Sequence, residues 1–164
     1  MKNRSESLMF LIGANNEDLD DAFHRYQTCL LEIKTKLTKG LYELATSDWY
    51  YDFTDHRCPH DSWLDGVNFT SRVSGERSEI RLLDIELKLL GAYHDLFLFF
   101  TYVNVKSYVL SDWNLELGHK DWIRDEFRLS EKGFVLHEIL WAGPDDKTRW
   151  VIECEDIHFR TVSV

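Results

Sequence analysis

Between residues 16 and 45, apolar side chains recur at alternating spacings of four and three positions. The stripe consists of Leu19, Phe23, Tyr26, Leu30, Ile33, Leu37, Leu41 and Leu44. Because an α-helix has 3.6 residues per turn, this spacing puts the whole stripe on one face and predicts one long amphipathic helix. Asn15 or Asn16 can cap its start, and Gly40 can end or break it. Such a stripe either covers the protein's own sheet or pairs with a second chain as a homodimer.

Further along the chain, apolar and polar residues alternate with a period of two, which is the period of a β-strand. Four leucine and isoleucine residues between 83 and 89 alternate with Asp84, Glu86 and Lys88, a pattern typical of a strand with one solvated face. The run Leu96–Val103 is apolar on both faces and predicts a central strand, with His94 and Asp95 in a hairpin turn before it. Shorter runs separated by turn formers continue to the C-terminus, which indicates a meander.

These patterns predict a single α+β domain over residues 1–164. We expect one long N-terminal amphipathic helix, about 16–45, packed on a curved antiparallel meander of about six strands within about 63–162. A partly closed barrel is the alternative arrangement of the same strands. The chain has 164 residues, of which 44% are hydrophobic, and this is enough for one core.

Charge narrows the classes of partner. There are 29 acidic and 19 basic residues, which gives a net charge of −10. This charge repels phosphate backbones and anionic lipids, so neither nucleic acid nor a membrane is expected as a partner, whereas a basic protein is compatible. The three cysteines, Cys29, Cys58 and Cys154, are isolated and odd in number. Their pattern indicates a reducing cytoplasm rather than a disulfide framework.

Catalytic and metal-binding motifs are scarce. His56 and His60 have the i, i+4 spacing of helical metal ligands, but Pro59 between them opposes a helix. No metal is therefore expected, and if one binds, its ligands are His56, His60 and Asp61. The sequence contains no GxSxG motif, glycine-rich phosphate loop or Rossmann fingerprint, so no catalytic residue and no cofactor are assigned. A metal-dependent or acid–base enzyme using His56, His60 and nearby carboxylates stays an alternative.

Two short segments look like polar sites but are better explained as strands. His137 and Glu138 are neighbours, and neighbours on a strand point to opposite faces, so they cannot act as one dyad. We expect Glu138 to face water or an arginine such as Arg124 or Arg128. In "WVIECEDIHF", residues 150–159, alternation places Trp150, Ile152 and Cys154 inward and puts Glu153 and Glu155 together on the other face.

Acidic residues and tryptophans are concentrated in the last three predicted strands. Aromatic anchors inside a charged rim suit a protein-binding face, although a solvated sheet face with ordinary salt bridges is the alternative. The candidate partner-binding residues are Asp121, Trp122, Asp125, Glu126, Glu138, Glu153 and Glu155.

The stretches "LLGAYHDLFLFFTYVNVKSYVL", "FRLSEKGFVLHEILW" and "WVIECEDIHF" resemble segments of small, acidic, largely uncharacterised bacterial proteins, some of which are similar to immunity proteins of polymorphic toxin systems. The resemblance implies a cytoplasmic inhibitor that occludes a basic toxin domain. The expected function is thus a non-enzymatic acidic protein-binding module. A homo-oligomeric structural protein, associating through the N-terminal helix, is a third hypothesis.

Overall fold

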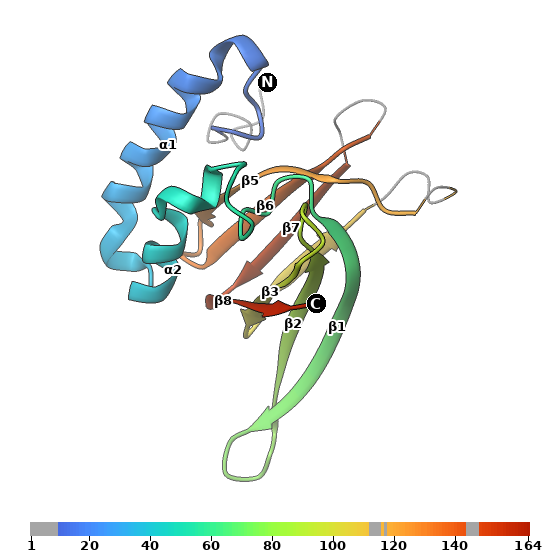
Figure 1. Ribbon diagram of the computed structural model, residues 1–164. Coiled ribbons are helices and arrows are strands. Elements are labelled where there is room, and N and C mark those ends of the chain that lie inside the picture. Colours follow the sequence, from blue (N-terminus) through green and yellow to red (C-terminus); the bar gives the residue numbers. More distant parts are fainter. Residues whose placement is uncertain (1–9, 112–115, 117, 144–147) are drawn as a thin grey trace.

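Among the described residues, the segment before the first strand contains two α-helices rather than one. The computed structural model describes residues 10–111, 116, 118–143 and 148–164 (Figure 1). Helix α1 spans Leu19–Ile33 and α2 spans Lys39–Ala45, with 3₁₀ turns at Asn16–Asp18, Lys34–Lys36 and Asp48–Tyr51. Asn15 makes no side-chain capping bond to the first turn.

The predicted continuous helix over about 16–45 is therefore wrong. Leu37 adopts an extended backbone, and Thr38 starts a new helix because its hydroxyl oxygen accepts the Leu41 N–H at 3.3 Å. The break precedes Gly40, which lies in the first turn of α2. The apolar stripe nevertheless faces the core across the break, and its buried members are Tyr26, Leu30, Leu37, Leu41 and Leu44. These five members of the stripe therefore pack within the chain.

In the described part of the chain, eight strands form two four-stranded sheets, and the neighbouring strands in each sheet are antiparallel. They are β1 (Trp63–Ser74), β2 (Ile80–Leu90), β3 (Leu96–Val103), β4 (Ser107–Leu110), β5 (Trp122–Leu129), β6 (Val135–Trp141), β7 (Thr148–Cys154) and β8 (Asp156–Ser163). We call the sheet with order β1-β2-β3-β8 sheet A and the sheet with order β4-β7-β6-β5 sheet B. The α+β class and the antiparallel pairing are confirmed. The single six-stranded meander is not, because β4 and β8 pair with strands that are not their neighbours in sequence, and the described strands do not close a barrel.

The two sheets are joined at a corner where one strand was predicted. β7 ends at Cys154 and β8 begins at Asp156, while the Glu155 N–H donates to the Val103 carbonyl at 3.0 Å. Trp150, Ile152 and Cys154 are buried as predicted. Glu155 lies at the corner between the strands and is exposed, whereas Glu153 is buried within β7, and beyond the corner the alternation changes phase so that Ile157 is buried. The expectation that Glu153 and Glu155 lie side by side on one strand face is wrong for this reason.

The core lies between the inner faces of both sheets and the helices. In Figure 1, α1 and α2 lie together on one side of the sheets. Tyr50, which follows α2, connects the layers, since its ring contacts Phe100 of β3 and Phe127 of β5 with centroids 6.5 and 5.8 Å apart. The predicted hairpin turn is confirmed at residues 91–95, where the Gly91 N–H donates to the Leu96 carbonyl at 2.9 Å. Of the helices within the described residues, none is long and apolar enough to cross a bilayer.

Candidate functional site

A pocket of about 520 Å³ opens between the start of α1, the segment after α2 and the first half of β5. Its walls are mainly aromatic and aliphatic, with a small number of ionisable groups, which is the usual composition of a binding pocket. The aromatic lining residues are Phe23, Tyr50, Tyr51, Phe53 and Trp122, and the ionisable ones include Asp20, His60, Arg124 and Asp125.

A bulge in β5 shapes the floor of this pocket. Trp122 pairs with Trp141 and Arg124 with Leu140, so Ile123 is an extra residue without a partner on β6. Because of it, Trp122 and Asp125, which are three positions apart, both point into the core, and the Trp122 indole N–H donates to Asp125 Oδ1 at 3.3 Å. The Ile123 carbonyl is left to accept a hydrogen bond from His60 Nδ1 at 2.7 Å.

Behind the floor lies a buried chain of hydrogen bonds centred on Asp125. The Tyr50 hydroxyl donates to Asp125 Oδ2 at 2.7 Å, and His137 Nε2 lies 2.7 Å from the same oxygen. The other ring nitrogen of His137, Nδ1, lies 2.8 Å from the Tyr102 hydroxyl oxygen. With the Tyr102 hydroxyl donating to Nδ1 and Nε2–H donating to Asp125, each side-chain polar atom in this series of hydrogen bonds has a partner.

Burial fixes the protonation of the two phenols in this chain. It raises the pKa of Tyr50 and of Tyr102 well above the ordinary value for tyrosine, so both stay protonated and act as donors. His137 is completely buried and Asp125 is 2% exposed. A substrate cannot reach the imidazole, so this Asp–His pair organises the core and places a carboxylate behind the pocket floor, rather than activating a nucleophile.

The next residue of β5, Glu126, points to the opposite face of sheet B and organises a second polar network. Its Oε2 accepts the backbone N–H groups of Phe10, Leu11 and Ile12 at 3.0, 2.7 and 3.3 Å. Its Oε1 lies 2.9 Å from Arg128 Nε as an ion pair. Three converging N–H groups form a concave anion-binding arrangement of the backbone. The carboxylate therefore attaches the N-terminal segment to the sheet.

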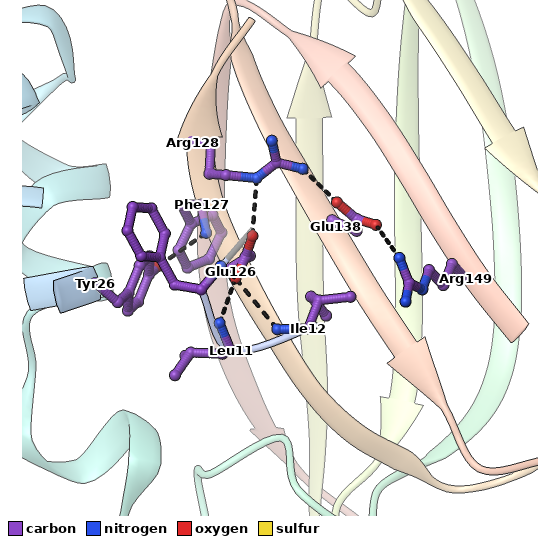
Figure 2. A network of polar contacts seen from close by, with 9 residues as sticks. Leu11, Ile12, Tyr26, Glu126, Phe127, Arg128, Glu138 and Arg149 are labelled. Carbon is purple, nitrogen blue, oxygen red and sulfur yellow. Dashed lines mark hydrogen bonds and ion pairs between the residues drawn. The ribbon is translucent and has the colours of Figure 1, made fainter. Parts of the chain in front are cut away.

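This second network extends across three strands. Figure 2 shows Arg128 between Glu126 and Glu138, with Arg149 beyond Glu138. Arg128 Nη2 donates to Glu138, and Arg149 Nη1 lies 3.6 Å from the same carboxylate. Glu126 is fully buried, and burial raises the pKa of its carboxyl although Arg128 and the three N–H groups lower it. The predicted pairing of Glu138 with Arg128 is confirmed.

Each of the two networks holds a residue that lines the pocket. Leu11, whose N–H binds Glu126, is part of the pocket lining, and so is Tyr50, whose hydroxyl binds Asp125. Arg124 also reaches the N-terminal segment, because its Nη1 donates to the Leu11 and Ala14 carbonyls at 3.2 and 3.3 Å. The pocket is consequently preformed by buried polar bonds and needs no ligand to define it.

The predicted partner-binding residues do not gather on one exposed face. Trp122 and Asp125 belong to the core, and Glu126 and Glu138 belong to the network of Figure 2. Glu153 is 8% exposed and accepts the Ser107 hydroxyl at 3.0 Å.

Only two of the seven are exposed. They are Asp121, which adjoins the buried Trp122, and Glu155, whose Oε1 lies 2.6 Å from Lys106 Nζ. Inward alternation, the cover provided by residues 10–12 and two arginines account for the burial of the other five.

The predicted metal ligands point to different partners. His56 Nδ1 lies 2.6 Å from Asp95 in the β2–β3 turn, and its ring stacks on Tyr93 at 4.0 Å. His60 stacks on Phe53 at 3.9 Å, while its Nε2 lies 3.4 Å from Asp61. Within the part of the chain that the structure describes, no three His, Cys, Asp or Glu side chains form a group that could hold a metal ion.

The two buried thiols, Cys58 and Cys154, have raised pKa values. Cys58 lines the pocket and donates to the Tyr50 carbonyl at 3.1 Å, and burial raises its pKa to about 11. Burial raises the pKa of Cys154 to about 12. Both thiols are thus protonated at neutral pH, which opposes thiolate nucleophilic catalysis.

Sequence reasoning missed the pocket because its lining comes from three distant segments. The cluster of aromatic residues in "DWYYDF", residues 48–53, was the available signal, and it supplies Tyr50, Tyr51 and Phe53.

Comparison of the chain with protein-family models, curated proteins and solved structures finds no significant match.

Proposed function

We propose that this protein is a non-enzymatic binding domain for a basic protein, and that its pocket receives a lysine or arginine side chain of that partner. One observation carries the proposal: aromatic walls are combined with a carboxylate at the mouth, Asp20, and another behind the floor, Asp125. Aromatic faces attract cations through their quadrupoles, and carboxylates add a direct attraction.

The charges of the lining groups are consistent with this occupant. The lining contains two carboxylates, Asp20 and Asp125, and one guanidinium, Arg124. The Arg124 guanidinium donates to the Leu11 and Ala14 carbonyls. The mouth is more acidic than the interior, since Glu17, Asp18 and Asp21 are exposed beside Asp20 at the start of α1. A cationic side chain therefore meets increasingly negative surroundings as it approaches.

The charge of the whole molecule supports the same class of partner. A net charge of −10 steers basic proteins toward the surface and repels nucleic acids. Together with the resemblance to immunity proteins, this supports a specific form of the proposal, in which the domain occludes a basic toxin domain.

Peptide display tests the proposal without knowledge of the partner. A random peptide library on phage is selected against the purified protein, and the binders are synthesised and titrated by fluorescence anisotropy. We expect lysine- or arginine-containing peptides, and we expect Asp20→Lys to weaken them at least tenfold, which corresponds to about 1.4 kcal/mol.

A matched control separates local from general electrostatics. Glu76→Lys makes the same change of charge at an exposed position in the β1–β2 turn, far from the pocket, and it should weaken the peptides less than threefold. Selected peptides without basic residues, or equal losses in the two variants, contradict the proposal. Co-expression with the product of the adjacent reading frame tests the toxin form separately, because it requires a stoichiometric complex that Asp20→Lys weakens.

A further inference from the structure

The β1–β2 hairpin extends beyond the core as an arm. Its strands pair from Trp63 with Leu90 to Ser74 with Ile80, and every residue from Asn68 to Arg81 is exposed. In Figure 1 the turn at its tip lies well apart from the helices and from the other strands. We call residues 68–81 the hairpin arm.

The outer edge of the arm is open for pairing. β1 is the outermost strand of sheet A, and among the described residues it pairs with β2 alone. Edge strands are commonly protected by lysine, proline or a bulge. Residues 68–74, "NFTSRVS", contain neither lysine nor proline, and their register with β2 is unbroken. The one charge in this segment, Arg72, is bound by Asp84 with Nη2 to Oδ1 at 2.9 Å.

Apolar side chains on the arm share one face. Phe69 and Val73 are four positions apart, so they point the same way, and they are 46% and 64% exposed. The Phe69 ring contacts Tyr108 of β4, which is itself 46% exposed. The face is therefore an apolar surface that continues from the arm to the second sheet.

Local charge distinguishes between a basic partner and a second copy of the chain. Residues 63–90 contain five acidic residues and four basic ones, which gives a net charge of −1 compared with −10 for the whole chain. A basic protein has no electrostatic reason to prefer this hairpin, and two copies do not repel each other here. The local charge therefore permits the association of identical edges, whereas it offers a basic protein little attraction.

We propose that the β1 edges of two copies pair in an antiparallel manner about a two-fold axis at Ser71. This register places Phe69 opposite Val73 of the second copy, and such an aromatic pair with a β-branched side chain stabilises antiparallel strands. It also places Arg72 opposite Thr70 of the second copy. A register centred on Arg72 would bring two arginines together, which is unfavourable. The paired edges form a continuous sheet of eight strands, four from each copy.

Cysteine cross-linking tests both the interface and its register. Residues directly opposite in antiparallel strands have Cα atoms about 4.5–5.5 Å apart, within disulfide range. Ser71→Cys, made in a Cys29→Ser background, should therefore form a covalent dimer under mild oxidation. In Ser74→Cys, the two introduced thiols lie about 20 Å apart along the strands and should not cross-link.

Sedimentation velocity tests the same interface without oxidation. We expect the mass to rise with concentration from 19.5 kDa to twice that value, and we expect Val73→Lys to abolish the increase. Ile80→Lys is the matched control, since Ile80 is on β2 and is 48% exposed, and it should dimerise normally. A monomer at all concentrations, a dimer unaffected by Val73→Lys, or equal cross-linking through positions 71 and 74 overturns the proposal. None of these changes touches the pocket, so the outcome is independent of peptide binding.

Discussion

Replacement of Glu126 tests how strongly one buried carboxylate holds the N-terminal segment. Glu126→Ala removes the acceptor of three backbone N–H groups and one partner of Arg128. Each lost hydrogen bond costs about 0.5–1.5 kcal/mol, and loss of a buried ion-pair partner costs more. Arg128 keeps Glu138 as a partner, so its charge is not left unpaired. We therefore expect Glu126→Ala to lower the free energy of unfolding by about 3–5 kcal/mol.

This loss is large compared with the stability of an ordinary domain, which is about 5–15 kcal/mol. Urea denaturation at pH 7 measures it, and thermal denaturation should show a decrease in Tm of about 10 °C. Hydrogen exchange locates the effect, since the amides of Phe10, Leu11 and Ile12 should lose their protection. Glu131→Ala, an exposed replacement in the turn of the β5–β6 hairpin, is the control and should change stability by less than about 0.5 kcal/mol.

Glu126→Gln separates the charge of this side chain from its shape. The amide keeps one oxygen to accept the N–H groups, so it should cost less than Glu126→Ala. Burial raises the pKa of Glu126 in the folded protein. A raised pKa means that the folded state binds the proton more tightly, so this group favours folding below its unfolded pKa, and the contribution disappears as pH rises through the folded value.

The pH dependence gives the result that would refute this reasoning. On titration from pH 7 down toward pH 5, the wild-type protein should gain stability relative to Glu126→Gln, because only the wild type can take up this proton. If the difference between the two proteins is independent of pH, or if Gln is as damaging as Ala, the role assigned to the carboxylate is wrong.

Three further predictions concern the pocket, the thiols and the helix break. Tyr50→Phe removes a donor to a buried carboxylate and should lower the free energy of unfolding by about 1.5–3 kcal/mol in urea denaturation; a change below 0.5 kcal/mol would show that the bond contributes little. Cys58 and Cys154, with pKa values of about 11 and about 12, should resist a thiol reagent at pH 7.5 until denaturant is added, and rapid labelling of either in the folded protein would contradict their assigned burial. Thr38→Ala removes the N-terminal cap of α2 and the bond that the Thr38 hydroxyl donates to Asp156 Oδ1 at 2.7 Å, and it should cost about 1–2 kcal/mol, measured by thermal denaturation against Thr35→Ala, an exposed replacement in the preceding 3₁₀ turn.

The strands that were predicted correctly from the sequence are those in which the pattern of neighbouring apolar and polar residues indicates a strand. Alternation between residues 83 and 89 and the apolar run Leu96–Val103 correspond to β2 and β3, and the turn between them lies where His94 predicts it. His137 and Glu138 point to opposite faces, as strand geometry requires. These features depend on near neighbours, which a sequence displays directly.

The features that were missed depend on contacts between distant segments. Leu37 continues the helical spacing of its stripe, although its backbone is extended, so periodicity alone cannot reveal the break. Glu155 continues the alternation of β7, and only its bond to Val103 marks the corner. Glu126 looks like a surface acid until residues 10–12, more than 110 positions away, are placed against it.

The position of β5 explains why acids that resemble a surface form the frame of a pocket. β5 is the edge of sheet B, so one side of the strand is free to meet α1, and there the Phe127 N–H donates to the Tyr26 hydroxyl at 2.8 Å. Its neighbouring carboxylates, Asp125 and Glu126, point to opposite faces and bind the segments before and after the helices. The helical layer is therefore attached to one strand from three directions. The pocket lining includes Leu11, Tyr50 and Asp125, which take part in two of these attachments, so a partner that binds there should stabilise the helical layer against the sheet.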